Sequence, residues 1–304
     1  MGDDFGLKKS LGLSDNPFDP LMPGLNKRIA GDAMPVDQYP NLVERMFCAE
    51  VAGVREAEQK LRSALFGRRK DDDGSQVRSA ILIVQGVRGS GRTTLANLIR
   101  GWLLRRRTEN ADLWESCDLL FDCYTPPPAT DDVRSKFSEL QSALGKMIQN
   151  GSKQVVVVID NLPCGYFNNV VSVYKSADRL NRVFVVTTDD LDLIESDLDA
   201  YEPVIEPVTL TKLTAKDVRA FINKRVGDYR CNQVKLPQSE EFNLFPFAST
   251  APDRAVGNGS KPMRNVQQWL RRQIEERHDL LAGQGDALDV ADLAAEALLQ
   301  RMIP

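Results

Sequence analysis

The sequence predicts an α/β fold, a parallel sheet covered by helices, followed by an all-helical C-terminal domain. Two observations predict this architecture. Between residues 79 and 210, short apolar runs rich in β-branched residues alternate with helical patterns, and after residue 210 the β-branched runs stop. Continuously apolar strands separated by helices are typical of a parallel sheet buried on both faces. With 304 residues, the chain is long enough for two or three domains.

The expected elements follow one another in a regular order. Strands are expected at 80–84, 117–123, 154–159, 183–186 and 204–210, with helices at 93–107 and 131–149. Thr214-Ala-Lys-Asp217 has the pattern of a capping box, which predicts a helix that starts after Thr214. Apolar residues at helical spacing predict two further helices, at 263–278 and 289–299.

The N-terminal part differs from this pattern. Residues 1–40 are rich in Gly, Pro and Asp, which favours an extended, wrapping arm over a packed element. A helical pattern runs from residue 39 to 66, and a charged loop at 67–78 separates it from the first expected strand. The expected organisation is an N-terminal arm and helical segment at 1–78, an α/β core at 79–210 and a helical domain at 211–304.

Composition excludes several classes of protein. Hydrophobic residues make up 42% of the chain, charged residues 27%, and the net charge of -4 argues against a surface built throughout for nucleic acid. Five scattered cysteines and a single histidine do not form the pattern of a zinc site or a disulfide framework. The chain starts without an apolar signal core, and no run approaches the roughly 18 apolar residues of a membrane span. We therefore expect a cytoplasmic protein with no membrane partner.

The stretch QGVRGSGRTT has the spacing of a phosphate-binding loop. G-x-x-x-x-G-[KR]-[ST] fits from Gly86 to Thr93, between an apolar strand and an amphipathic helix. In such a loop backbone N–H groups converge on phosphates at a helix N-terminus, and a Thr hydroxyl holds Mg²⁺. We expect ATP or ADP with Mg²⁺ as the ligand, and Thr93 as a metal ligand. The expected nucleotide-binding residues are Gly86, Gly89, Ser90, Gly91, Arg92, Thr93 and Thr94.

The apolar strand at 154–159 ends in Asp160-Asn161. An acid at the carboxyl end of such a strand would hold Mg²⁺ through its water shell, so Asp160 is the second expected metal ligand. Asn161 is expected to orient water, but an amide cannot accept the proton of that water.

Two further candidates complete the expected site. Thr187 or Thr188, at the end of the next strand, would reach the terminal phosphate, the alternative being that either Thr only caps its strand. Arg264 follows Lys261-Pro262 at the start of a C-terminal helix, where a cation is unfavourable for the helix dipole. This position favours a contact with phosphate over a solvated Arg. Asp160, Asn161, Thr187 and Arg264 are the expected catalytic residues.

These motifs together resemble the AAA+ ATPases, over about residues 79–300. GVRGSGRTT, VVVVID, VFVVTT and the PMR helix carry the resemblance, and the arm GLSDNPFDP is similar to the opening of regulators of transposition and secretion. The origin-recognition initiators are also similar, and Thr93-Thr94-Leu95 with Asp160-Asn161 resembles the STAND switches. The resemblance implies a P-loop NTPase core, a helical lid, a homo-oligomer and a protein partner.

Two departures from the AAA+ pattern matter for function. Arg92 stands where these families mostly keep Lys in Walker A, and Asn161 stands where hydrolytic members place Glu after the Walker B Asp. In addition, no arginine lies between residues 183 and 216 to serve as an arginine finger, which would have to come from elsewhere, for example Arg179 or Arg182. The guanidinium of Arg92 does not match a compact ammonium at the phosphates. Losing such contacts affects the transition state more than ground-state binding.

Three hypotheses for function can be stated. The leading one is an ATP-binding AAA+-type module with weak or no hydrolysis, acting as a nucleotide-stabilised scaffold or switch. The rival is an active AAA+ ATPase that remodels a protein or DNA complex, and the third is a scaffold that has lost the nucleotide. The basic runs at 68–70 and 105–107 leave DNA open as a partner, although three aspartates follow the first and a helix end accounts for the second.

Overall fold

The computed structural model describes residues 7, 10–18, 21–22, 27–28, 54–60, 80–99, 116–122, 130–150, 154–179, 181–189, 204–231, 235–283, 293 and 295–304. Their contacts divide the chain into two units, one of residues 1–33, 48–52 and 212–304, the other of residues 34–47 and 53–211. The expected helix at 39–66 is described at 54–60, and the expected helix at 93–107 is described as far as residue 99. The remaining parts of both lie outside the described residues.

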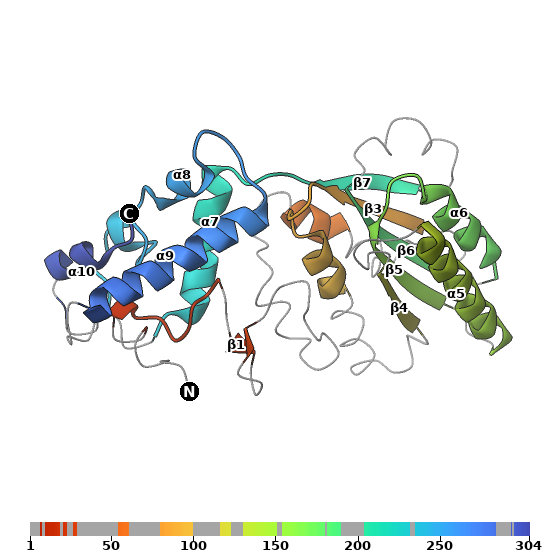
Figure 1. Cartoon of the computed structure of the whole chain (residues 1–304), viewed down its shortest axis with the longest axis horizontal. Coiled ribbons are helices and arrows are strands. Elements are labelled where there is room, and N and C mark those ends of the chain that lie inside the picture. Colours follow the sequence, from red (N-terminus) through yellow and green to blue (C-terminus); the bar gives the residue numbers. More distant parts are fainter. Residues whose placement is uncertain are drawn as a thin grey trace, which may run out of the picture. The chain divides into compact units, whose positions relative to one another are not determined.

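The second unit contains the parallel sheet that the sequence predicts. Its strands are β3 (Ala80–Gly86), β4 (Ser116–Asp122), β5 (Gln154–Leu162), β6 (Asn181–Thr188) and β7 (Val204–Leu210), in the order β4-β5-β6-β3-β7. Every neighbouring pair is parallel. The strand order places β6 between β3, which leads into the glycine loop, and β5, which carries Asp160 (Figure 1).

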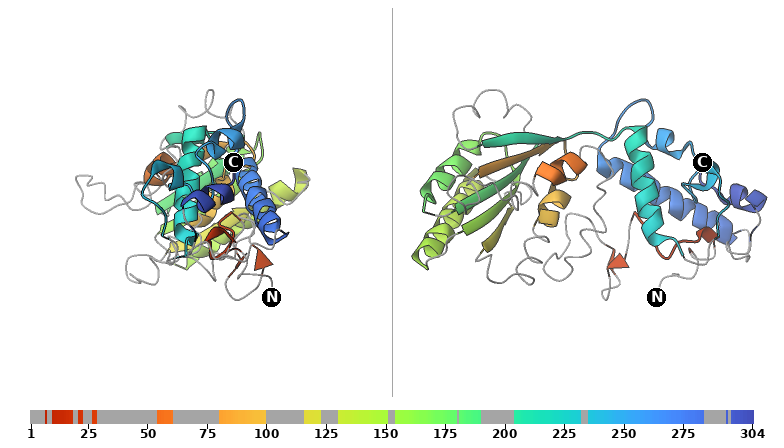
Figure 2. Two further views of the ribbon diagram at one scale, coloured as in Figure 1. Left: turned by 90° about the vertical axis from the view of Figure 1, so that its left-hand side faces the viewer. Right: turned by 180° about the vertical axis from the view of Figure 1, so that it is seen from behind.

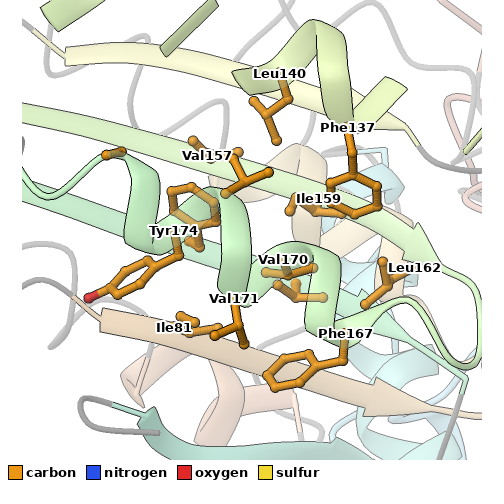
Figure 3. Packing of buried hydrophobic residues seen from close by; sticks show 14 of the residues in the cluster. Ile81, Phe137, Leu140, Val157, Ile159, Leu162, Phe167, Val170, Val171 and Tyr174 are labelled. Carbon is orange, nitrogen blue, oxygen red and sulfur yellow. The ribbon is translucent and has the colours of Figure 1, made fainter. Parts of the chain in front are cut away.

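Helices cover both faces of this sheet. Figure 1 shows α5 (Thr130–Gln149) and α6 (Phe167–Ser176) on one face and the helical segments 54–60 and 92–99 on the other, and Figure 2 shows the same layers from behind. The strand residues that pack against α5 and α6 are Ile81, Ile83, Val155, Val157, Ile159, Phe184 and Val186 (Figure 3). They alternate with residues of the opposite face, as the period of two in a strand requires.

The same alternation places the polar residues of β5 and β6. Because Ile159 and Val186 point toward α5 and α6, Asp160 and Thr187 point to the opposite face, where the helix after the glycine loop lies. Thr187 is fully buried and Asp160 nearly so. The fold therefore brings the ends of β5 and β6 to the start of the helix that follows β3.

The α/β unit differs from the sequence-based expectations in several strand ends and in one helix. β3 and β6 extend beyond the expected 80–84 and 183–186, to Ala80–Gly86 and Asn181–Thr188. β5 extends to Leu162, and α6 is a helix that was not predicted. In α6, Phe167, Val170, Val171 and Tyr174 recur at helical spacing and are all buried. The valines of this segment have a higher propensity for strands, but the buried helical face outweighs that preference.

The first unit is helical in its C-terminal part. It contains α7 (Ala215–Tyr229), α8 (Ala251–Val256), α9 (Met263–Gly283), α10 (Ala295–Arg301) and the 3₁₀ turn Glu240–Phe242, together with the short strands β1 (Leu21–Met22) and β2 (Lys27–Arg28). The predicted capping box is confirmed: the Thr214 hydroxyl accepts from the Asp217 N–H, and the Asp217 carboxylate accepts from the Thr214 N–H. Helix α10 begins at Ala295, whereas a start at residue 289 was expected. None of the helices in the described ranges is long and apolar enough to span a membrane.

Residues 10–18 of the N-terminal arm pack onto this helical unit. The Phe18 ring is buried and lies 5.6 Å from the Phe221 ring and 5.9 Å from the Phe247 ring, measured between centroids. The Ser14 N–H donates to the Tyr229 carbonyl at 2.8 Å, and the Cys231 N–H donates to the Gly12 carbonyl at 2.9 Å. A buried aromatic side chain contributes several kcal/mol, about 3–5 for a Phe truncated to Ala. The arm is therefore part of the core of the helical unit.

Candidate functional site

The glycine loop turns sharply between β3 and the helix that follows it. A Cβ atom at Gly86 would collide with the Ser90 hydroxyl and come within 3.0 Å of the Leu210 carbonyl oxygen of β7. Gly89 and Gly91 have φ angles of 86° and 102°, a left-handed region that favours glycine. The loop therefore needs glycine where the sequence has it, for reasons of backbone geometry that do not depend on a ligand.

The helix begins directly after Gly91. The Ser90 N–H donates to the Val87 carbonyl at 3.0 Å, and the Leu95 N–H donates to the Gly91 carbonyl at 2.9 Å, which is the first helical bond. The N–H groups of a first helical turn have no acceptors within their own helix, and they carry the positive end of the helix dipole. This end of the helix has the geometry of an anion site.

Two polar atoms of the loop are buried without a partner. Among the residues that the structure describes, neither the Ser90 hydroxyl nor Arg92 Nη1 has a hydrogen-bond partner, and their side chains are 4% and 7% exposed. A buried polar group without a partner costs about 1–3 kcal/mol, and more if it is charged. A phosphate oxygen would supply acceptors for both groups, so the loop fits an anionic ligand.

Arg92 forms an ion pair across the strand ends. Its Nη2 lies 3.5 Å from Oδ2 of Asp189, the residue that directly follows β6, and the Asp189 side chain is 55% exposed. Burial lowers the pKa of Arg92, and the negative charges of Asp189 and Asp160 oppose that decrease. The guanidinium is thus held at the loop by a carboxylate that itself remains in contact with solvent.

Asp160 is held by β6 and by its own neighbour. The Thr187 hydroxyl donates to Asp160 Oδ1 at 2.5 Å, and the Asn161 side-chain amide donates to Asp160 Oδ2 at 3.0 Å. Thr187 Oγ1 also accepts the Asn161 N–H at 2.9 Å. These donors fix the position of the Asp160 carboxylate at the end of β5.

Asn161 has an uncommon backbone conformation. Its φ is 54°, a left-handed conformation in which Asn is several times more frequent than most other residues. The side-chain amide turns back toward the loop and donates to the Thr93 hydroxyl at 3.4 Å as well as to Asp160. Asn161 therefore connects the end of β5 to the first turn of the helix after the glycine loop.

The structure brings most of the predicted site residues together and separates the two threonine alternatives. Arg92, Thr93, Asp160, Asn161 and Thr187 form one cluster, with Gly86, Gly89, Ser90, Gly91 and Thr94 in the adjoining loop and helix turn. Thr188 points to the other face and donates to the Leu162 carbonyl at 2.9 Å, which is a structural bond. Arg264 belongs to the helical unit, where its side chain is exposed on the first turn of α9.

Asp189 is the site residue that sequence reasoning missed. The motif around it, TTDD, was considered only for its threonines. The available signal was the position of Asp189 in the sheet. Because β6 lies next to β3, an acid directly after β6 lies near Arg92, the first residue of the helix that follows the glycine loop. That inference needs the strand order, which the sequence did not supply.

Comparison with known proteins identifies the fold. No family model and no curated protein matches the sequence. Among solved structures, the Aeropyrum pernix ORC2 protein, in ADPNP–ADP complexes, is similar at a TM-score of 0.52 and 12% identity over 82% of this chain and 68% of that chain. A RuvB variant from Thermotoga maritima has a TM-score of 0.43 and 17% identity, over 81% of this chain and 67% of that chain. Trip13 from Rhizobiales has a TM-score of 0.42 and 14% identity, over 88% and 90%.

The class defined by these observations is the α/β P-loop NTPase fold. The parallel sheet, the glycine loop between β3 and its helix, and the similarity to ORC2 all agree on it. At 12% identity the likeness to ORC2 concerns the fold alone.

The left-handed conformation of Asn161 generates a prediction about stability. Asn161→Ala and Asn161→Gly both remove the amide bonds to Thr93 and Asp160, so both variants should unfold more readily than the parent. The Ala variant should be the less stable of the two by about 0.5–1 kcal/mol, since a left-handed φ costs an L-residue about 1–2 kcal/mol and the flexibility of Gly offsets part of that difference. Urea denaturation measures the order. An Ala variant at least as stable as the Gly variant would contradict it.

Proposed function

We propose that the chain is an AAA+-type protein that binds ATP or ADP at the glycine loop, hydrolyses it slowly or not at all, and uses the nucleotide to stabilise an assembly with copies of itself and a protein partner. The observation that carries the proposal is the pair of buried, unpartnered groups in the loop, the Ser90 hydroxyl and Arg92 Nη1. Both are donors, they adjoin the positive end of a helix, and together they are suited to phosphate oxygens. The AAA+ likeness of the sequence motifs supports the same ligand.

The donor set near the loop also suits Mg²⁺. Thr93 offers a hydroxyl and Asp160 a carboxylate, and Mg²⁺ prefers oxygen ligands in this class of site. The Asn161 amide donates to both groups and holds them next to each other. Mg²⁺ held by these two oxygens would neutralise part of the charge of the phosphates.

Slow turnover follows from the position of Asn161. Its amide nitrogen is engaged by Thr93 and Asp160, and an amide cannot accept the proton of an attacking water. Arg92 adds to the effect, because its planar guanidinium differs in shape and reach from an ammonium group. The alternative is an active AAA+ ATPase that remodels a protein or DNA complex, with the missing groups supplied by a neighbouring subunit.

The proposal assigns a role to each part of the chain. We take residues 1–78 as an arm and helical segment, 79–210 as the nucleotide-binding core and 211–304 as a lid whose Arg264 senses the phosphates, in a cytoplasmic protein. A ligand shifts an equilibrium between two arrangements only through its different affinity for them. A contact worth about 1–3 kcal/mol shifts such an equilibrium about 5- to 150-fold, which is enough for a switch without hydrolysis.

Nucleotide binding is tested with a variant of the loop. Arg92→Ala combined with Thr93→Ala should weaken ATP and ADP affinity at least about tenfold, since it removes the buried cation and the hydroxyl beside it. Arg134→Ala is the control, because Arg134 is an exposed arginine of α5, on the opposite face of the sheet. Titration calorimetry measures both. A double variant that binds as tightly as the parent would show that the loop is not the binding site.

Turnover is tested by steady-state phosphate release. The parent should release phosphate more slowly than about 1 per second, the low end for typical enzymes, with or without DNA. Asn161→Ala should leave this slow rate unchanged, because the amide does not take part in activating water. A fast parent rate, or a large loss of rate in Asn161→Ala, would favour the ATPase alternative.

The switch is tested by assembly. ATP should increase self-association of the parent. Arg264→Ala should reduce that increase, since the proposal couples nucleotide binding to assembly through the contact between Arg264 and phosphate. Sedimentation of parent and variant, each with and without ATP, gives four samples. The same assembly state in all four would leave a static scaffold in place of a switch.

A further inference from the structure

We propose that Asp189 is a built-in competitor of the nucleotide, whose carboxylate holds Nη2 of Arg92, one of the two guanidinium donors that a bidentate contact with phosphate needs. The inference rests on the proposed nucleotide binding and adds the residue that sets its affinity. Asp189 supplies an anion to the Arg92 guanidinium, as a phosphate would. A phosphate that enters the loop displaces the Asp189 carboxylate and takes its place beside the Arg92 guanidinium.

The geometry of Arg92 carries the first step. The guanidinium is 7% exposed and can meet few groups, of which Asp189 Oδ2 lies at 3.5 Å. Nη1 has no partner among the described residues, so a phosphate could contact it alone, but the bidentate contact that arginine favours also needs Nη2. A phosphate bound in this way has to displace Asp189. A lysine at this position, with a shorter reach and no planar edge, would not form the same contact.

The different exposure of the two partners carries the second step. Asp189 is 55% exposed, so its carboxylate can rotate into solvent and regain hydration at little cost. Arg92 is buried and remains at the loop when Asp189 leaves. The ion pair therefore opens on the Asp189 side, and a phosphate finds the cation still in place.

Asp160 does not serve as the competitor, although its charge also acts on Arg92. Both of its oxygens accept hydrogen bonds, from Thr187 at 2.5 Å and from the Asn161 amide at 3.0 Å. It is 4% exposed and cannot move into solvent without breaking these bonds. Among the described residues, Asp189 is the carboxylate that both contacts Arg92 and can leave it.

The experiment compares nucleotide affinity in matched variants of the full chain. Asp189→Asn removes the competing charge but keeps the size of the side chain, and it should tighten ATP and ADP binding about two- to fivefold, the range expected for a half-exposed ion pair. Asp178→Asn is the control, an exposed aspartate in the turn after α6 with the same change of net charge. Its affinity should equal that of the parent. Calorimetric titration with each nucleotide gives the dissociation constants.

A second pair of variants tests whether Asp189 acts through Arg92. In an Arg92→Gln background, the Asp189→Asn change should have no effect on affinity, because the shared cation is gone. If Asp189→Asn still tightens nucleotide binding in the Arg92→Gln background, Asp189 repels the phosphate directly and does not act through Arg92. That result would overturn the proposal.

The remaining outcomes separate this inference from the proposed function. If the parent binds nucleotide and Asp189→Asn binds it equally or less tightly, Asp189 does not compete with the nucleotide, whereas the proposed nucleotide site is retained. If Asp189→Asn binds nucleotide and the parent does not, Asp189 blocks the site, which is the strongest support. Absence of binding in all variants would overturn the nucleotide site and the competitor with it.

Discussion

The burial of opposite charges at the carboxyl ends of β3, β5 and β6 is the constraint on which the site depends. Asp160 and Arg92 are both almost excluded from solvent, and a buried charge without a partner destabilises a protein by several kcal/mol, about 3–5 when one member of a pair is removed. The strand order solves this for both charges at once. Because β6 lies between β3 and β5, its end offers Thr187 to Asp160 and Asp189 to Arg92. One strand end thus connects the glycine loop to the acidic strand.

Most of the α/β fold could be predicted from the sequence, because hydrophobic periodicity and local motifs encode it. The valine run of β5, the Gly-rich turn after β3 and the Thr214–Asp217 capping box are each specified by a few neighbouring residues. Helix α6 was missed, since its valines favour a strand and only their spacing indicates a helix. The burial of Phe18 among Phe221 and Phe247 joins residues about two hundred positions apart, and local pattern gives no account of such a contact.

The site was predictable where spacing determines it and unpredictable where strand order does. The loop glycines and Asp160 follow from motif and position, and the structure brings them into one cluster. The choice between Thr187 and Thr188 depends on which face of β6 each occupies, and the contact between Asp189 and Arg92 depends on β6 being next to β3. The conformation of Asn161 is a further example. Compared with the AAA+ pattern, Asn161 is an amide in place of an acid. Its φ of 54° gives a second reason for the residue type, because Asn adopts the left-handed conformation more readily than most residues.

The two departures from the AAA+ pattern then belong to one arrangement. Arg92 Nη2 pairs with Asp189, and the Asn161 amide donates to Thr93 and Asp160, whereas Arg92 Nη1 and the Ser90 hydroxyl have no partner among the described residues. Near the loop, the charge of Arg88 acts on Arg92 together with the charges of Asp189 and Asp160, so two guanidinium groups and two carboxylates lie around the site. On our proposal, release of Asp189 to solvent leaves Arg92 to the phosphate, so the affinity for nucleotide depends on the Asp189–Arg92 ion pair as well as on the glycine loop. A partner that favours either the closed or the open ion pair would then change that affinity.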